Sequence, residues 1–206
     1  MAKSLKSPAK QLVLASGNTK KINEIMDMLQ PFGWQVSAQT DFFTCEVEET
    51  GLSFIENALL KARYACAKTG LPAIADDSGL EVSALNGQPG IYSARYASEN
   101  ATDQENIAKL LQQMAQVPKG QRQASFYCAM AFCRHQYDPT PMIALGQWQG
   151  EILDQPVGTG GFGYDPIFYV PALGVSSAQL SKQQKSQVSH RALALKELVE
   201  QIKALN

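Results

Sequence analysis

The chain has 206 residues, of which 45% are hydrophobic, and its formal net charge is −1. This length suits one large domain or two lobes that share a core. The balanced charge argues against binding to nucleic acid or to an anionic membrane, because proteins that bind either one usually carry an excess of Lys and Arg. Any anionic substrate must therefore be held by local cations.

The N-terminus and the cysteines indicate the compartment. Residues 1–10 are polar with scattered lysines and lack the apolar centre of a signal peptide. No apolar run approaches the roughly 20 residues of a membrane span. The four cysteines form no C-x-x-C pair, which predicts reduced thiols. We expect a soluble cytoplasmic protein in which residues 1–10 are a disordered extension and residues 11–206 form a single domain.

The first elements are a strand, a polar turn and a helix. Residues 11–16 read as a buried strand, and Gly17 and Asn18 separate it from an amphipathic helix over residues 19–29. A helix start binds anions through its outward-pointing N–H groups and its dipole. Lys20 and Lys21 lie in this first turn, where the dipole disfavours cations, so a polyphosphate would explain them. A solvated lysine pair is the alternative interpretation.

An acidic segment follows a second strand expected near residues 34–38. Glu46, Glu48 and Glu49 precede a helix that opens with the capping box Ser53-x-x-Glu56 and closes at Gly70. Three glutamates in four positions are a candidate metal shell. The alternative is that their negative charges interact favourably with the positive end of the helix dipole.

The central acidic pair follows a short apolar strand, residues 72–75. Asp76 and Asp77 are adjacent, so in an extended segment they point to opposite faces. One carboxylate is expected to support the backbone and the other to face a ligand, with Ser78 and Gly79 turning the chain. Carboxylates at such a place suit a divalent cation or an activated water. A polar turn between two strands is the alternative.

The next part of the chain alternates between helix and strand. Residues 87–90 form a turn, residues 91–96 are expected to be irregular or extended, and a capping box at Thr102 and Glu105 opens another helix. Residues 123–134 are a long strand, which residues 142–148 pair with as a hairpin. Residues 150–153 are expected to bend away as a further short strand.

A glycine-rich stretch, residues 158–166, has four glycines in six positions. Phe162 and Tyr164 offer flat faces for a base, and Asp165 offers an acceptor. A plain flexible loop is the alternative. A strand over residues 167–170 and a helix over residues 189–205 complete the chain, and that helix is preceded or opened by Lys185, His190 and Arg191.

Six of these segments match, in order, those of one family. They are Ala15-Ser-Gly-Asn-Thr-Lys-Lys21, Glu48-Glu-Thr-Gly-Leu-Ser-Phe-Ile-Glu-Asn-Ala58, Ala75-Asp-Asp-Ser-Gly-Leu80, Pro89-Gly-Ile-Tyr-Ser-Ala-Arg95, Gly158-Thr-Gly-Gly-Phe-Gly-Tyr-Asp-Pro166 and Ser189-His-Arg191. The chain resembles the inosine triphosphate pyrophosphatase family, and its bacterial members especially. The matches span nearly the whole chain after residue 10.

The resemblance implies an α/β fold with a long twisted mixed sheet, two lobes, a nucleotide cleft between them and a homodimeric state. It implies hydrolysis of deaminated purine nucleoside triphosphates such as ITP, dITP and XTP to the monophosphate and pyrophosphate, with Mg²⁺ as cofactor. Such activity keeps these nucleotides out of DNA and RNA.

The resemblance also implies roles for individual residues. The phosphate-binding turn corresponds to Ser16, Gly17, Asn18, Thr19, Lys20 and Lys21, where Lys20 replaces a glycine that bacterial relatives often carry. Glu48 and Asp77 correspond to the magnesium-associated carboxylates, and Asp77 also to the general base. Ser78 corresponds to a substrate contact. The base pocket corresponds to Phe162, Gly163, Tyr164, Asp165, Lys185, His190 and Arg191.

Two other functions remain open from the residues. An aspartyl-type phosphatase would use Asp76 or Asp77 as its nucleophile, although the D-x-D-x-[TV] spacing is missing. A non-catalytic nucleotide-binding module would use the same segments without chemistry. The identity of the product released from ITP separates the three.

Overall fold

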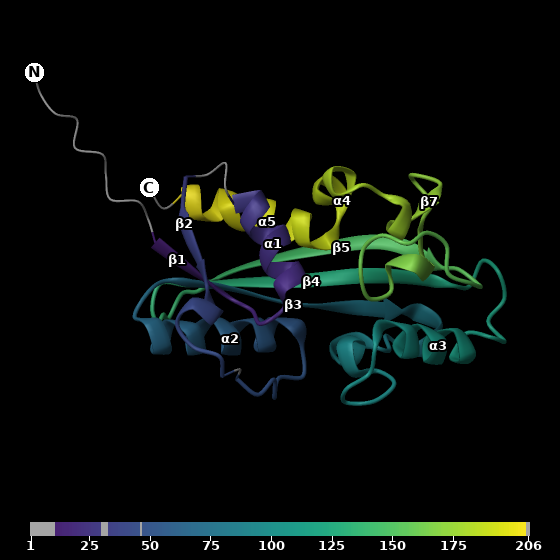
Figure 1. The fold of residues 1–206 in the computed structure, drawn as a ribbon, viewed down its shortest axis with the longest axis horizontal. Helices are drawn as coiled ribbons and strands as arrows, with labels where there is room; N and C mark the ends of the chain where they lie inside the picture. The colour runs from purple at the N-terminus through teal and green to yellow at the C-terminus, as the bar shows by residue number, and fades with distance from the viewer. Residues whose placement is uncertain (1–10, 30–32, 46, 205–206) are drawn as a thin grey trace, which may run out of the picture. The chain divides into compact units, whose positions relative to one another are not determined.

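The computed structural model describes residues 11–29, 33–45 and 47–204. The predicted disorder of residues 1–10 lies outside these ranges. The described residues form a mixed α/β fold around one seven-stranded sheet with the strand order β2-β1-β3-β4-β5-β6-β7 (Figure 1). Strand β1 is parallel to β2 and β3, whereas β6 is antiparallel to β5 and β7. The α/β class and the mixed sheet predicted from the sequence are confirmed.

The strands are β1 (Gln11–Ala15), β2 (Gln35–Ala38), β3 (Ala73–Val82), β4 (Gln123–Cys133), β5 (Met142–Ile152), β6 (Phe168–Val170) and β7 (Val175–Ser176). The α-helices are α1 (Thr19–Leu29), α2 (Phe54–Thr69), α3 (Asp103–Gln113), α4 (Lys182–Val188) and α5 (His190–Lys203). Short 3₁₀ helices include η4 (Gly90–Arg95), η5 (Asp165–Ile167) and η6 (Ser177–Gln179).

The chain divides into two compact units. Unit 1 comprises residues 1–76, 130–144 and 198–206, and unit 2 comprises residues 77–129 and 145–197. Strands β3 and β4 each contribute residues to both units, with the division in β3 falling between Asp76 and Asp77.

Unit 1 is built on buried strand β1 and helix α2. Three alanines of α2, Ala58, Ala62 and Ala65, are fully buried, and such small side chains allow close packing. The predicted N-cap at Ser53 and the predicted end at Gly70 are confirmed, although the Glu56 carboxylate accepts the backbone N–H of Leu52 at 2.9 Å rather than that of Ser53. Ser53 accepts a hydrogen bond from the backbone N–H of Glu56, and Gly70 takes the left-handed conformation with φ of 69°.

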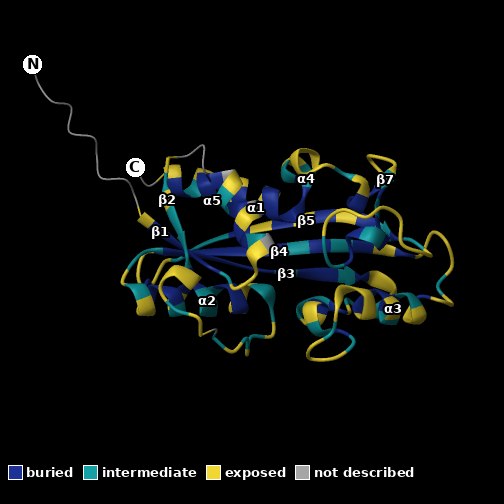
Figure 2. Cartoon of the chain, viewed as in Figure 1, coloured by how far each residue is buried: buried dark blue, intermediate teal, exposed yellow. Residues whose placement is uncertain are grey.

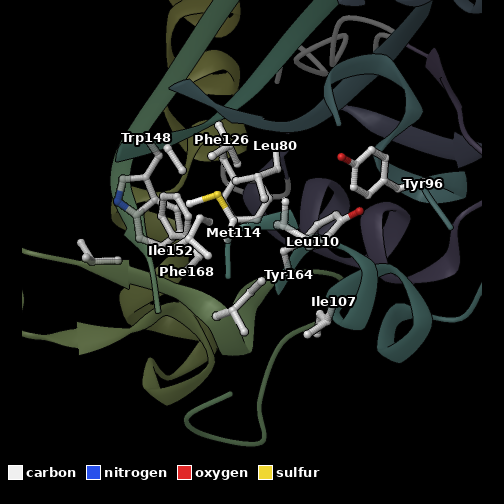
Figure 3. Close-up of a cluster of buried hydrophobic side chains, with 14 residues drawn as sticks. Leu80, Tyr96, Ile107, Leu110, Met114, Phe126, Trp148, Ile152, Tyr164 and Phe168 are labelled. Carbon is white, nitrogen blue, oxygen red and sulfur yellow. The ribbon is translucent and has the colours of Figure 1, made fainter. Parts of the chain in front are cut away.

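Unit 2 has a core rich in aromatic side chains (Figure 3). Phe126 lies with its ring centroid 4.6 Å from that of Phe168, and the Trp148 and Phe168 rings are 5.2 Å apart. Leu110 of α3 and Met114, the C-cap of that helix, are fully buried in the same cluster. Figure 2 shows the burial concentrated along the strands, while the helices keep exposed outer faces. This pattern is what amphipathic helices on a central sheet produce.

The predicted turn at Ser78 and Gly79 is wrong, because β3 continues without interruption to Val82. Residues on both sides of the predicted turn are buried, and the backbone N–H of Leu80 donates to the Ser93 hydroxyl at 2.9 Å. Burial and this backbone hydrogen bond keep the strand extended, and a polar dipeptide does not end it.

Other boundaries also differ from the prediction. Strand β5 runs through Gly150 to Ile152 rather than bending away, because Glu151 and Ile152 pair with Tyr169 and Phe168 of β6. Residues 90–95 are the 3₁₀ helix η4 rather than irregular or extended chain. The predicted end of the last helix at residue 205 lies outside the described residues. In the part of the chain that is described, no helix is both long and apolar enough to cross a bilayer.

Gly146 of β5 permits the start of α5 to approach the sheet closely. A Cβ at this position would lie 1.9 Å from the carbonyl oxygen of His190 and 2.7 Å from the backbone nitrogen of Ala194. Both neighbours are backbone atoms, so no side chain can rotate away. The helix and strand must separate if this residue acquires a side chain.

We therefore expect Gly146→Ala to lower the free energy of unfolding by about 3 kcal/mol, the upper part of the usual range for overpacking. Urea unfolding followed by circular dichroism measures the change. Gln147→Ala, on the exposed neighbouring residue of the same strand, is the matched control and should change stability by less than about 1 kcal/mol. Equal stability of the two variants would contradict the close approach.

Candidate functional site

In unit 1, the predicted phosphate-binding turn is an ordered cap at the start of α1. The Asn18 side-chain oxygen accepts the backbone N–H of Lys21 at 3.2 Å, and the Ser16 hydroxyl accepts the backbone N–H of Asn18 at 3.2 Å. Gly17 and Thr19 are exposed beside them. The side chain of Lys20 lies outside the described residues. The backbone of residues 16–21 is thus organised as a helix start open to solvent, a suitable place for an anion.

Lys21 has a protein partner that the sequence did not suggest. Its Nζ lies 3.1 Å from Oδ2 of Asp76, whose side chain is completely buried. Strand β1 leads into the turn and pairs with β3, where Ala15 lies beside Ala75, the residue before Asp76. The pair explains why a lysine is tolerated at a helix start, because its charge offsets a buried carboxylate.

The acidic segment does not gather into a metal shell of three protein ligands. Glu48 is exposed, and Glu49 pairs with Lys61 at 2.7 Å, while Glu46 is outside the described residues. Within residues 11–29, 33–45 and 47–204, no group of three or more His, Cys, Asp or Glu side chains could hold a metal ion. Asp77, the other predicted metal-associated carboxylate, is buried in unit 2.

In unit 2, Asp165 organises the glycine-rich stretch. Its Oδ2 accepts the backbone N–H of Phe162 at 2.9 Å and lies 2.5 Å from Nζ of Lys185, while its Oδ1 accepts the Ser177 hydroxyl at 2.7 Å. Gly161 is required here, because its φ is 75° and a Cβ would lie 2.0 Å from Oδ2 of Asp165. The stretch is a closely held loop, which argues against the flexible-loop alternative.

Two cations lie at the Phe162 ring. The Nζ of Lys185 is 4.8 Å from the ring centroid, and Cζ of Arg191 is 5.8 Å from it. Arg191 is 1% exposed and donates from Nη2 to the Ser78 hydroxyl at 3.2 Å. The loop, β3, α4 and α5 therefore bring four predicted site residues together as an aromatic ring surrounded by hydrogen-bond donors.

His190 and Tyr164 face the core of unit 2. The His190 ring stacks on Phe126 with centroids 4.8 Å apart and planes 12° apart. The Tyr164 hydroxyl donates to the carbonyl of Ser93 at 2.8 Å, and burial raises the pKa of this phenol. Tyr164 is 4% exposed, so its ring serves as core packing, unlike the half-buried ring of Phe162.

Sequence reasoning missed several residues that hold this region, among them Ser93, Asp103 and Ser177, together with the whole of α4. Ser181 opens α4 as the N-cap of a capping box with Gln184, a signal that was present in the sequence. The hydrogen bonds from Tyr164 to the Ser93 carbonyl and from Gly163 to Asp103 join residues more than 55 positions apart and have no local signature.

Comparison with known proteins assigns the chain to a family. The model of the Ham1 family matches residues 12–201. A dITP/XTP pyrophosphatase of Shigella flexneri is 55% identical over 193 residues, which cover 94% of this chain and 98% of the relative. The enzyme of the same name from Vibrio parahaemolyticus is 55% identical over 195 residues, covering 95% of this chain and 98% of the relative.

Solved structures agree with these matches. A HAM1 protein from Coxiella burnetii superposes with a TM-score of 0.88 at 46% identity, covering 94% of this chain and 98% of the other. The Staphylococcus aureus Ham1 protein superposes with a TM-score of 0.85 at 44% identity, covering 96% of this chain and all of the other. The resemblance found in the sequence motifs is thereby confirmed, and the chain belongs to the Ham1 family.

Proposed function

We propose that this protein is a nucleoside triphosphate pyrophosphohydrolase that cleaves ITP, dITP and XTP to the monophosphate and pyrophosphate. The observation that carries the proposal is the match of about 55% identity, over nearly the whole of both chains, to enzymes named dITP/XTP pyrophosphatase. Removing these nucleotides from the pool prevents their incorporation into DNA and RNA.

The donors around Phe162 support recognition of a 6-oxo purine. In the proposal the base stacks on the Phe162 ring, a contact worth about 1–3 kcal/mol for any base. Lys185, His190 and Arg191 act as hydrogen-bond donors toward the oxygen at position 6. A 6-amino group would present a donor to donors, and an unpaired buried polar group is costly, so adenine nucleotides are rejected.

The remaining predicted base-site residues have supporting roles in the proposal. Ser78 is held by Arg191, which places its hydroxyl beside the ring cluster of unit 2. Gly163 and Tyr164 continue the loop, and Asp165 fixes its backbone. The exposed start of α1, residues 16–21, binds the triphosphate through backbone N–H groups and Lys21.

The acidic residues fit Mg²⁺ as the cofactor. Mg²⁺ prefers oxygen ligands and is commonly held by one or two carboxylates together with substrate phosphates, so a group of three protein ligands is not required. Glu48 and Asp77 would hold it. When bound, the ion supplies charge neutralisation on the leaving pyrophosphate.

The chain's own residues carry the proton transfer. Asp77 accepts a proton from the water that attacks the α-phosphorus, which makes its carboxylate the general base. Lys21 and the α1 N–H groups stabilise negative charge on the phosphate oxygens. The P–O bond between the α-phosphorus and the bridging oxygen breaks, and pyrophosphate leaves.

A substrate panel tests the proposal. ITP, dITP, XTP, GTP and ATP are incubated with the protein and Mg²⁺ in ¹⁸O-labelled water, and the products are identified by mass spectrometry. We expect pyrophosphate and a monophosphate that carries one ¹⁸O, with ATP the poorest substrate. Release of free phosphate would favour the aspartyl-type phosphatase, and binding without product would favour the non-catalytic module. Chelation by EDTA should stop turnover.

The Lys21 side chain, which pairs with Asp76, is expected to bind the phosphates of the substrate too. We expect Lys21→Ala to weaken binding of α,β-methylene ITP by about tenfold or more, since a charge-assisted bond is lost, and to change IMP binding little. Calorimetry measures both affinities. Lys61→Ala is the control, because Lys61 also pairs with a carboxylate in unit 1 but lies outside the α1 start. Equal losses for the two nucleotides would contradict the phosphate role.

The assembly and the location of the protein are also proposals. The family resemblance supports a homodimer, which light scattering tests by a mass twice the 22.4 kDa of one chain. All four cysteines are free thiols, which supports a reducing compartment such as the cytoplasm.

A further inference from the structure

A second carboxylate holds the glycine-rich loop from outside it. Oδ2 of Asp103, the first residue of α3, accepts the backbone N–H of Gly163 at 2.8 Å, although the two residues are 60 positions apart. The preceding N–H, that of Phe162, is held by Asp165 at 2.9 Å. Two consecutive amides of the loop therefore bind two different carboxylates.

These two hydrogen bonds flank one α-carbon. The N–H of Phe162 belongs to the peptide plane before its Cα, and the N–H of Gly163 belongs to the plane after it. Peptide units are rigid and planar, so fixing both planes fixes φ and ψ of Phe162. The direction of its Cα–Cβ bond follows, and with it the position from which the ring projects toward Lys185 and Arg191.

The helix that carries Asp103, α3, is held in place by its cap, by hydrogen bonds and by its buried side chains. Thr102 and Glu105 form a reciprocal capping box at the start of α3. Asn106 accepts the backbone N–H of Ala97 at 2.8 Å and donates to the carbonyl of Ala94 at 3.1 Å. Ile107 and Leu110 bury the same helix in the core of unit 2. An aspartate on this helix can therefore impose a position on the loop rather than follow it.

We propose that Asp103 is a positioning residue for base recognition, acting through the Gly163 amide to orient the Phe162 ring. It does not contact the nucleotide. The inference rests on the proposed function only for what Phe162 binds, because the hydrogen bond itself is a property of the unliganded protein. Orientation before binding lowers the entropy lost when the base stacks, so its loss should appear in affinity rather than in the chemical step.

Kinetics of five variants test the proposal. Asp103→Ala should raise KM for ITP about three- to tenfold, the equivalent of one lost hydrogen bond, with kcat within about twofold. Asp103→Asn should retain most of the wild-type KM, since its amide oxygen can accept the same bond. Gln104→Ala is the matched control, because Gln104 is exposed on the same helix turn and takes no part in the capping box. In a Phe162→Ala background, Asp103→Ala should have no further effect on KM.

The Gly163 amide can be observed by NMR, which gives a test of the hydrogen bond that does not depend on enzyme activity. In ¹H–¹⁵N spectra its proton should move upfield and exchange faster in Asp103→Ala, but not in Gln104→Ala. Equal KM values for Asp103→Ala and Gln104→Ala, or an undiminished effect of Asp103→Ala when Phe162 is absent, would overturn the inference. A wild-type protein that releases no pyrophosphate from ITP would overturn the proposed function instead, and the amide spectra would still decide whether Asp103 holds the loop.

Discussion

Asp77→Asn is expected to lower kcat for ITP by about a thousandfold while the protein keeps its fold. Asparagine has nearly the same shape as aspartate, but it cannot accept the proton of the attacking water, and general-base catalysis contributes typically 10²–10⁴-fold. Asp77 is 7% exposed and lies within β3, so a substitution of equal volume preserves the packing. Steady-state kinetics of pyrophosphate release and a thermal melt measure the two effects.

The control for Asp77→Asn is the same substitution at an exposed aspartate that has no part in the proposed site. Asp154 pairs with Arg122 at 3.3 Å and has a side chain that is 59% exposed. Asp154→Asn should leave kcat unchanged. If Asp77→Asn kept activity within about tenfold of the wild type, a barrier change of only about 1.4 kcal/mol, the assignment of the base would fail.

Asp165→Ala should produce the largest loss of stability among the site variants. The carboxylate binds the Phe162 amide, the Ser177 hydroxyl and Lys185, and its removal leaves the ammonium of Lys185 buried without its counter-charge. Breaking a buried pair from one side costs about 3–5 kcal/mol. We expect this decrease in the free energy of unfolding, together with a higher KM for ITP.

A double variant tests the cause of the stability loss. Asp165→Ala combined with Lys185→Met removes the uncompensated charge, so stability should recover by at least about 1 kcal/mol. An unchanged free energy of unfolding in the double variant would show that the buried Lys185 charge is not the cause.

Asp138→Ala is the matched control in unit 1, since Asp138 is also about 1% exposed and binds Arg134 at 2.8 Å. The Arg134 guanidinium holds the pKa of Asp138 below its usual range, so its contribution is complete above the ordinary carboxyl pKa and is lost as the pH falls through the lowered pKa. At neutral pH the control should lose stability and keep the wild-type KM.

Local signals predicted much of the fold. The bounds of α1 and the caps of α2 were readable because each depends on residues within a few positions, such as Ser53 and Glu56. The continuation of β3 through Ser78 and Gly79 was not readable. It depends on partners such as Ser93 that the sequence does not place beside the strand.

In the candidate site, too, some features could be predicted from the sequence and others could not. The residue types at Phe162, Lys185 and Arg191 could be picked out from the sequence, and the structure brings them together. The use of each polar group could not be predicted. Asp165 was expected to offer an acceptor to a ligand, yet both of its oxygens accept hydrogen bonds within the protein. A carboxylate's partners are set by tertiary contacts, which composition and spacing do not encode.

The close fit of Gly161 against Asp165 limits how this loop can evolve. Any side chain at residue 161 would displace the carboxylate, and a residue at 165 without a matching acceptor would release the Phe162 amide, so neither position can change freely alone. The backbone of the loop is thereby inherited as a unit. New preferences among bases should arise instead through side chains that project from this backbone, as that of Phe162 does, while the loop beneath them keeps its shape.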